Sequence, residues 1–110
     1  MKKIVLIFTG GTISMEVYDR STGVVPSLSA NEIIKKLQSV TSYKNLFGVQ
    51  FSMIPSPSMT PQLMEKLSAE VIDHLEQPDV IGVVISHGTD TLEETAFYLD
   101  LVIDSSKPVV

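Results

Sequence analysis

Cysteine and tryptophan are absent from the 110-residue sequence, and only eight residues are lysine or arginine. Without cysteine, the chain has no disulfide framework, no thiol nucleophile and no thiolate metal site. The net charge is −5, and the few basic residues are scattered apart from Lys2-Lys3 and Lys35-Lys36. Binding to phosphate backbones needs clustered positive charge, and a membrane-spanning helix needs about 20 apolar residues in a row. The sequence therefore predicts neither nucleic acid nor a membrane as a partner.

Composition places the chain among globular proteins, because 44% of the residues are hydrophobic and 19% are charged. At this length one core is expected, so we predict a single domain over residues 1–110. The opening MKKIVLIF resembles the start of a secretion signal, but the apolar run stops at Thr9-Gly10 and no small-residue cleavage site follows. We interpret this segment as a strand and expect a cytoplasmic protein.

Strands and helices alternate along the chain in the apolar pattern. Continuous or partly alternating apolar runs predict strands, and a capping box or a proline after threonine predicts helix starts at Ser29 and Thr60. Residues 14–28 have no clear period and are predicted to form a long loop. The strands are expected at 4–8, 49–54, 80–85 and from 107 onward, and the helices at 29–42, 60–75 and 92–103.

This order predicts an α/β fold in three layers, with a mostly parallel sheet covered by helices on both faces. It is typical of part of a Rossmann-like or flavodoxin-like domain. The last predicted strand has only begun at Val110, so we expect the chain to be part of a longer protein.

Polar residues follow the first three predicted strands, in the segments 9–12 (TGGT), 56–59 (SPSM) and 86–91 (SHGTDT). In an open parallel sheet, ligands bind beyond the carboxyl ends of the strands. We therefore expect the three segments to lie at one edge of the sheet, where they form a site.

The TGGT segment has two interpretations. Its glycines allow a sharp bend, and Thr12 then projects from the turn as a possible nucleophile; a purely structural turn needs only the glycines. The segment lacks the third glycine of a dinucleotide-binding motif and the lysine of a phosphate-binding loop, so it does not indicate a phosphate site.

The HGTDT segment contains more polar groups than a helix cap requires. A capping box formed by Asp90 with Glu93, or by Thr91 with Glu94, explains one residue but not Thr89. His87 is a possible general base or metal ligand. However, His74 is not at ligand spacing and is expected to be exposed within a helix, so no metal site is predicted.

Two further hydroxyls remain open between a structural and a functional role. Ser56 lies in a proline-rich bend and is either a turn residue or a ligand for a carboxylate. Tyr18 is either an exposed loop aromatic or a side chain that folds over the site.

Together the two signature stretches, TGGTI at residues 9–13 and HGTDT at 87–91, resemble those of the bacterial-type L-asparaginases. The longer run ISHGTDTLEETAFYLDLVI and the final KPVV are also similar to that family. The resemblance therefore extends from one end of the chain to the other.

The resemblance implies hydrolysis of L-asparagine to L-aspartate and ammonia through an acyl-enzyme, in a homo-oligomer and without a metal or organic cofactor. It implies that Thr12 is the nucleophile and that Tyr18 on a lid loop assists it. It also implies that Thr89 and Asp90 respectively help to activate the attacking group and hold the α-amino group, and that Ser56 binds the α-carboxylate. An anionic carboxylate suits an ammonium, and hydroxyls suit a carboxylate, so the implied ligand is a small zwitterion.

The chain departs from the family pattern in several places. It has Pro57 where the family often has glutamine, and Tyr18 follows Thr12 more closely than in many relatives. The family's catalytic lysine and smaller carboxyl-terminal domain lie downstream of Val110, and Lys107 belongs to a different segment. We therefore expect these 110 residues alone to hydrolyse asparagine negligibly.

Two alternatives use the same residues. One is a non-catalytic α/β module that binds a small amino acid or forms an assembly interface. The other keeps the chemistry but acts on glutamine or on an amide attached to transfer RNA.

Overall fold

The computed structural model describes residues 1–10, 15–19, 23–26 and 30–110, with side chains for 1–10 and 30–110. Its centre is a three-stranded parallel sheet in the order β4-β1-β5. The strands are β1 (Lys3–Gly10), β4 (Leu46–Ile54) and β5 (Val80–Ser86). The three predicted strands are thus confirmed, and each extends slightly beyond its predicted range.

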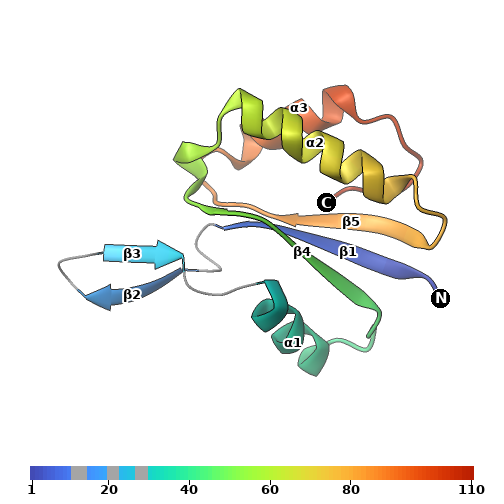
Figure 1. Cartoon of the computed structure of the whole chain (residues 1–110), viewed down its shortest axis with the longest axis horizontal. Helices are drawn as coiled ribbons and strands as arrows, with labels where there is room; N and C mark the ends of the chain where they lie inside the picture. The colour runs from blue at the N-terminus through green and yellow to red at the C-terminus, as the bar shows by residue number, and fades with distance from the viewer. Residues whose placement is uncertain (11–14, 20–22, 27–29) are drawn as a thin grey trace.

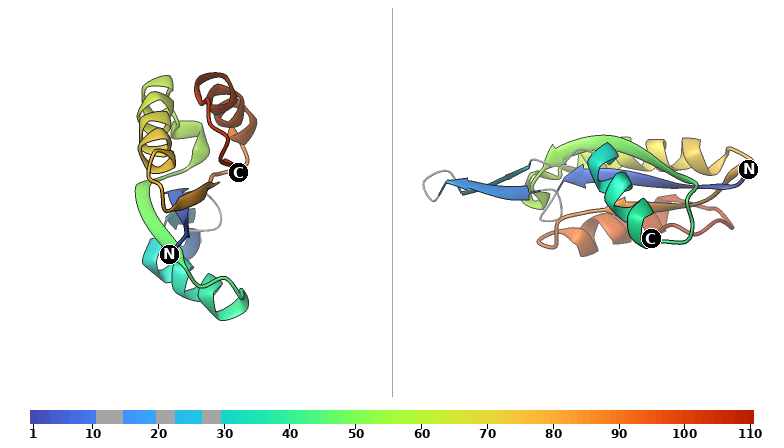
Figure 2. Two further views of the ribbon diagram at one scale, coloured as in Figure 1. Left: turned by 90° about the vertical axis from the view of Figure 1, so that its right-hand side faces the viewer. Right: turned by 90° about the horizontal axis from the view of Figure 1, so that it is seen from below.

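Helices cover both faces of this sheet (Figure 1). α2 (Pro61–Leu75) and α3 (Leu92–Val102) lie on one face, and α1 (Ala30–Val40) lies on the other; the views in Figure 2 agree. The predicted three-layer α/β fold is confirmed. None of the helices in the described ranges is long and apolar enough to cross a membrane.

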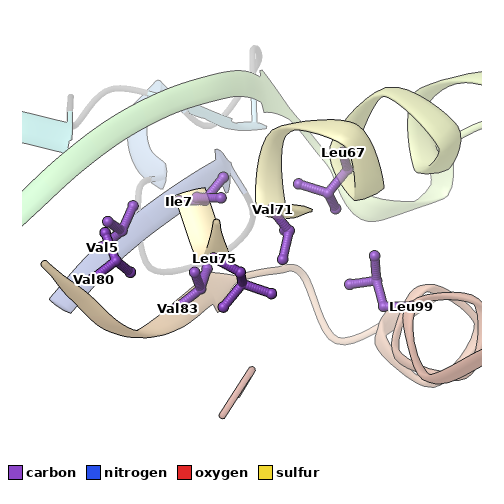
Figure 3. Close-up of a cluster of buried hydrophobic side chains, with 8 residues drawn as sticks. All are labelled: Val5, Ile7, Leu67, Val71, Leu75, Val80, Val83 and Leu99. Atoms are coloured by element: carbon purple, nitrogen blue, oxygen red, sulfur yellow. The ribbon is translucent and has the colours of Figure 1, made fainter. Parts of the chain in front are cut away.

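β1 contributes side chains to a hydrophobic core on each face of the sheet, because successive side chains of a strand point to opposite faces. Val5 and Ile7 pack with residues of β5, α2 and α3, as Figure 3 shows for this cluster. Leu6 and Phe8 pack against α1. A strand buried on both faces needs apolar side chains at every position, which explains the continuous apolar run.

The segment after α3 pairs with the free edge of β5, as predicted from its sequence. Val109 forms a parallel bridge with Val83, and the Val110 carbonyl accepts a 2.7 Å hydrogen bond from the Ile85 amide. Across the sheet the order is therefore β4, β1, β5 and the segment around Val109. Counted along the chain, these are the second, first, third and fourth parallel strands. This is the order that flavodoxin-like sheets begin with.

The predicted loop at residues 14–28 is wrong in part. β2 (Met15–Asp19) and β3 (Gly23–Pro26) form a two-stranded antiparallel hairpin with Val17 opposite Val24. In Figure 1 it extends beyond the end of the sheet at which β1 ends. Its strands have only five and four residues, so the alternation in each is too short to stand out from the polar residues between them.

One of the two predicted helix starts can be compared with the structure. Thr60 is the N-cap of α2, and its hydroxyl accepts a 3.2 Å hydrogen bond from the Leu63 amide, as predicted. Ser29 lies outside the described residues. Its predicted capping box with Glu32 therefore stays a prediction. The amide of Ala30, the first residue of α1, donates to Gln50 Oε1 at 2.8 Å.

The buried residues of α3 are Thr95 and Leu99, whereas Leu92 is 44% exposed. One prediction of burial is wrong. His74 is not exposed, because its side chain retains 12% exposure and its Nε2 lies 3.0 Å from Glu70. Periodicity identifies an apolar face but not what packs against it.

Candidate functional site at the carboxyl edge of the sheet

The strand order creates a switch point between β1 and β5. The connection after β1 leads to β4 on one side of it, and the connection after β4 crosses back to β5 on the other side. Ligands of open α/β sheets bind in the crevice beyond the strand ends at such a point. The segments that leave β1 and β5 here are the TGGT and HGTDT stretches.

Thr9 and Gly10 hold the strand ends together at this edge. The Thr9 hydroxyl donates to the Ser86 carbonyl at 2.7 Å, and the Thr9 carbonyl accepts from the Ser52 hydroxyl at 2.7 Å. Gly10 has a φ of +109°, and a Cβ there would lie 2.6 Å from the Ile54 carbonyl oxygen. Only glycine fits this backbone and this contact. Because the Thr9 hydroxyl is used in the hydrogen bond to Ser86, we interpret Thr9 as a structural residue and not a reactive one.

Thr12 lies outside the described residues. Tyr18 is part of strand β2, whereas the sequence predicted a loop there, and its side chain is not described. The roles of both residues stay predictions.

Ser56 is buried within the turn that follows β4. It begins the 3-10 helix η2 (Ser56–Ser58) and is 5% exposed. A Cβ on Gly88 would lie 2.8 Å from Ser56 Cβ and 2.9 Å from its hydroxyl oxygen. The turn after β4 is thus in contact with the HGTDT segment after β5. Because Thr9 is hydrogen-bonded to Ser86, the segment 86–91 contacts both of the other predicted segments.

Thr91 makes a second contact between these two segments. Its hydroxyl donates to the Ser56 carbonyl at 2.8 Å, although 35 residues separate the two in sequence. Thr91 is the N-cap of α3, but its side chain makes no capping hydrogen bond. Neither predicted capping box is therefore formed: the Thr91 hydroxyl donates to the neighbouring turn and accepts no hydrogen bond from an amide of α3.

His87 has a structural role that the sequence did not reveal. Its Nδ1 lies 2.7 Å from the Gly88 carbonyl, which can only accept, so Nδ1 donates. Its Nε2 lies 2.8 Å from the hydroxyl of Thr95, a 2% exposed residue of α3, and accepts from it in the neutral ring. Both nitrogens are occupied, which leaves neither for a general base or a metal ligand. Thr95 was missed because a threonine within an apolar helix face gives no distinct sequence signal.

Thr89 and Asp90 are exposed between these fixed residues. Within the described part of the chain, neither side chain has a hydrogen-bond or ion-pair partner. Glu93 and Glu94 follow in the first turn of α3, where the helix dipole favours negative charge. The exposed end of the segment is thus acidic, which suits a cationic group of a ligand.

Lys107 lies at the opposite edge of the sheet. Its Nζ donates to the carbonyls of Leu75 and Gln77 at 2.6 and 2.7 Å, at the carboxyl end of α2. A cation there satisfies the last carbonyls of the helix. Because α2 begins beside the Ser56 turn, its far end and Lys107 are remote from the site. Lys107 is therefore a helix cap.

A groove of about 340 Å³ runs beside α3 and the carboxyl-terminal segment. Leu92, Ala96 and Leu99 are among its lining residues, together with His87. It does not include Ser56, Thr89 or Asp90, so it is a separate feature from the predicted site.

The sequence was compared with protein families and with known proteins. The family model described as "Asparaginase, N-terminal" matches residues 3–110. The glutaminase-asparaginase of Acinetobacter glutaminasificans is 37% identical over 97% of this chain and 33% of its own length. L-asparaginase 2-3 of Saccharomyces cerevisiae is 37% identical over 99% of this chain and 31% of its own length.

A solved structure agrees with these matches. The crystal structure of the probable cytoplasmic L-asparaginase from Campylobacter jejuni superposes with a TM-score of 0.84 at 31% identity, covering 99% of this chain and 33% of that one. The chain spans about one third of the length of the relatives that it matches. With the family model matching almost the whole sequence, the chain belongs to the asparaginase family and corresponds to its amino-terminal domain.

Proposed function

We propose that the chain is the amino-terminal part of an amidohydrolase that converts L-asparagine and water to L-aspartate and ammonia. The observation that supports this most directly is the contact between the Ser56 turn and the HGTDT segment at the switch-point edge. β1 ends at the same edge, and Thr12 is two residues beyond its last residue, Gly10. Family membership and the names of the relatives support the same reaction.

The substrate is a small zwitterion held by both of its charged groups. The exposed Asp90 carboxylate accepts hydrogen bonds from the α-ammonium, and the Ser56 hydroxyl donates to the α-carboxylate. The acidic first turn of α3 adds to the attraction for the ammonium. This leaves the side-chain amide to be directed toward Thr12.

In the first step, the Thr12 oxygen attacks the amide carbon, the carbon–nitrogen bond breaks, and the hydroxyl proton leaves with the nitrogen as part of ammonia. A water molecule then hydrolyses the resulting ester, which releases aspartate and restores the hydroxyl. A neutral hydroxyl is a poor nucleophile, so a neighbouring group must accept its proton. Thr89 and Tyr18 are assigned to this assistance, and backbone N–H groups of the strand-end turns to stabilising the oxyanion.

The remaining parts of the proposal concern the whole protein. We propose that it is cytoplasmic and homo-oligomeric, and that a downstream lysine completes the proton relay with Thr89 and Asp90. Lys107 cannot substitute for this lysine because it caps α2 at the opposite edge. The isolated 110 residues should therefore release ammonia negligibly.

Glutamine is a second candidate substrate. The Acinetobacter relative, 37% identical to this chain, is named a glutaminase-asparaginase. Glutamine has one methylene more than asparagine, and one methylene changes binding in an apolar pocket by only about 10- to 200-fold. Turnover of glutamine should therefore be measured beside that of asparagine.

The test is ammonia release by the full-length parent with asparagine and with glutamine. Thr12→Ala and Thr89→Ala should each lower kcat, by about a thousandfold or more for the nucleophile. Thr41→Ala is the matched control, because the Thr41 hydroxyl accepts only from the Tyr43 amide, beyond the far end of α1. Its kcat should stay within about twofold of the parent.

A parent that releases no ammonia from either amide, or a Thr12→Ala variant with full turnover, contradicts the proposal. If the parent binds the amino acids without turnover and the two variants change only affinity, the non-catalytic binding module is the correct reading.

A further inference from the structure

Thr91 occupies a position at which threonine normally bonds to its own helix. An N-cap hydroxyl usually accepts from a backbone amide in the first turn, which removes one unsatisfied donor. The Thr91 hydroxyl makes no such bond and donates to the Ser56 carbonyl at 2.8 Å. Among the described residues, it is the one side-chain hydrogen bond between the turn after β4 and the segment after β5. The hydroxyl is therefore used as a donor across the site edge and makes no capping hydrogen bond as an acceptor.

Gly88 restrains the same turn from another direction. The missing Cβ of Gly88 leaves room for Ser56, whose Cβ and hydroxyl oxygen would lie 2.8 and 2.9 Å from it. Contact with Gly88 sets how closely the Ser56 turn approaches, and the Thr91 hydrogen bond keeps it from moving away. Asp90 lies between these two contact residues in the sequence. Ser56 and Asp90 are thus held at a defined spacing.

We propose that Thr91 is a positioning residue that fixes the distance between the carboxylate-binding Ser56 and the ammonium-binding Asp90. The inference rests on the proposed function, in which these residues bind the two charged groups of one amino acid. The two groups are attached to the same carbon atom, so their binding residues tolerate little change in spacing. A displacement of about 1 Å can lower the rate of a positioned reaction about a hundredfold.

Thr91→Val tests the inference, because valine keeps the branched shape and removes only the hydroxyl. No capping bond is lost, so α3 itself should be little affected. In the full-length parent, we expect the KM for asparagine to rise about tenfold or more. Thr91→Ser keeps the hydroxyl and should restore the KM to within about threefold of the parent.

Ser68→Ala is the matched control for stability. The Ser68 hydroxyl donates to the Glu65 carbonyl at 2.7 Å, and the residue is buried within α2, away from the site. Its loss should lower the melting temperature to an extent comparable with Thr91→Val, while the KM stays unchanged.

A pair of competitive inhibitors separates positioning from a general structural effect. L-Aspartate has both charged α-groups, whereas succinate lacks the ammonium. Thr91→Val should weaken inhibition by aspartate about tenfold and by succinate less than about threefold, because only aspartate needs both groups at the set spacing.

Equal losses for the two inhibitors, or an unchanged KM in Thr91→Val, would overturn the inference while leaving the amidohydrolase intact. A wild-type parent without ammonia release would instead refute the proposed function.

Discussion

Among Gly10, Gly48, Gly82 and Gly88, Gly10 is the glycine at which the structure predicts the largest effect of a single added methyl group. Its φ of +109° lies in a region that residues with a side chain rarely adopt. In Gly10→Ala the new Cβ would lie 2.6 Å from the Ile54 carbonyl oxygen and 2.7 Å from the Ile54 nitrogen. Both are backbone atoms of β4, so the contact cannot be relieved by rotating a side chain.

The magnitude follows from three contributions. The unfavourable backbone conformation costs about 1–2 kcal/mol, and overpacking against fixed atoms costs about 1–3 kcal/mol. Reduced entropy of the unfolded chain offsets about 0.4–1 kcal/mol. We therefore expect Gly10→Ala to lower the free energy of unfolding by about 1–5 kcal/mol, a large part of the roughly 5–15 kcal/mol of a small domain.

Urea unfolding of the 110-residue chain, followed by circular dichroism, measures this loss. Gly48→Ala is the control, because the position has no positive φ and its new Cβ meets the Ile34 side chain at 2.9 Å. The buried Ile34 side chain must shift to relieve this contact, which costs about 1–3 kcal/mol. The unfavourable backbone conformation of Gly10 is absent at Gly48, so Gly48→Ala should be less destabilising than Gly10→Ala. If Gly10→Ala is no more destabilising than Gly48→Ala, the account of this strand end is wrong.

Two further substitutions test contacts away from the reacting groups. Lys107→Met removes the cation that binds two carbonyls at the end of α2 and should lower the free energy of unfolding by about 1.5–3 kcal/mol, measured in urea. Lys36→Met, at an exposed lysine, should change it by less than about 0.5 kcal/mol, and equal effects would contradict the cap. Thr95→Val leaves His87 Nε2 without its donor and should cost about 1–3 kcal/mol, with Thr95→Ser retaining most of the stability. A valine variant as stable as the parent would contradict the role assigned to this bond.

The sheet could be predicted from sequence because its strands are buried on both faces. Ile4 to Phe8 and Val80 to Ile85 are continuous apolar runs of a length that fits strands, and glycine or polar residues end each one. Strand order then follows from short right-handed crossovers. The hairpin was missed because its two strands are short. The alternation of apolar and polar residues within 15–19 and 23–26 is too brief to indicate a strand.

Contacts within the site could not be predicted because they depend on hydroxyl groups with several possible partners. Thr91 could bond to its own helix or to another segment with equal chemical plausibility, and only the fold brings the Ser56 carbonyl within 2.8 Å. His87 likewise looked reactive in the sequence, whereas Thr95 and the Gly88 carbonyl occupy both ring nitrogens. The sequence identifies the edge of the sheet at which the polar segments lie. It does not show which of their side chains are hydrogen-bonded within the fold and which are exposed.

The HGTDT segment shows how the fold makes that division. His87 is bonded to α3, Gly88 is packed on the turn after β4, and Thr91 is bonded to the same turn. Thr89 and Asp90 are exposed between them on a backbone that is held at both ends. Side chains on a fixed backbone lose less conformational entropy when they order around a ligand, so more of each contact contributes to binding. In the proposed function, the three anchored residues therefore fix the backbone from which Thr89 and Asp90 contact the substrate.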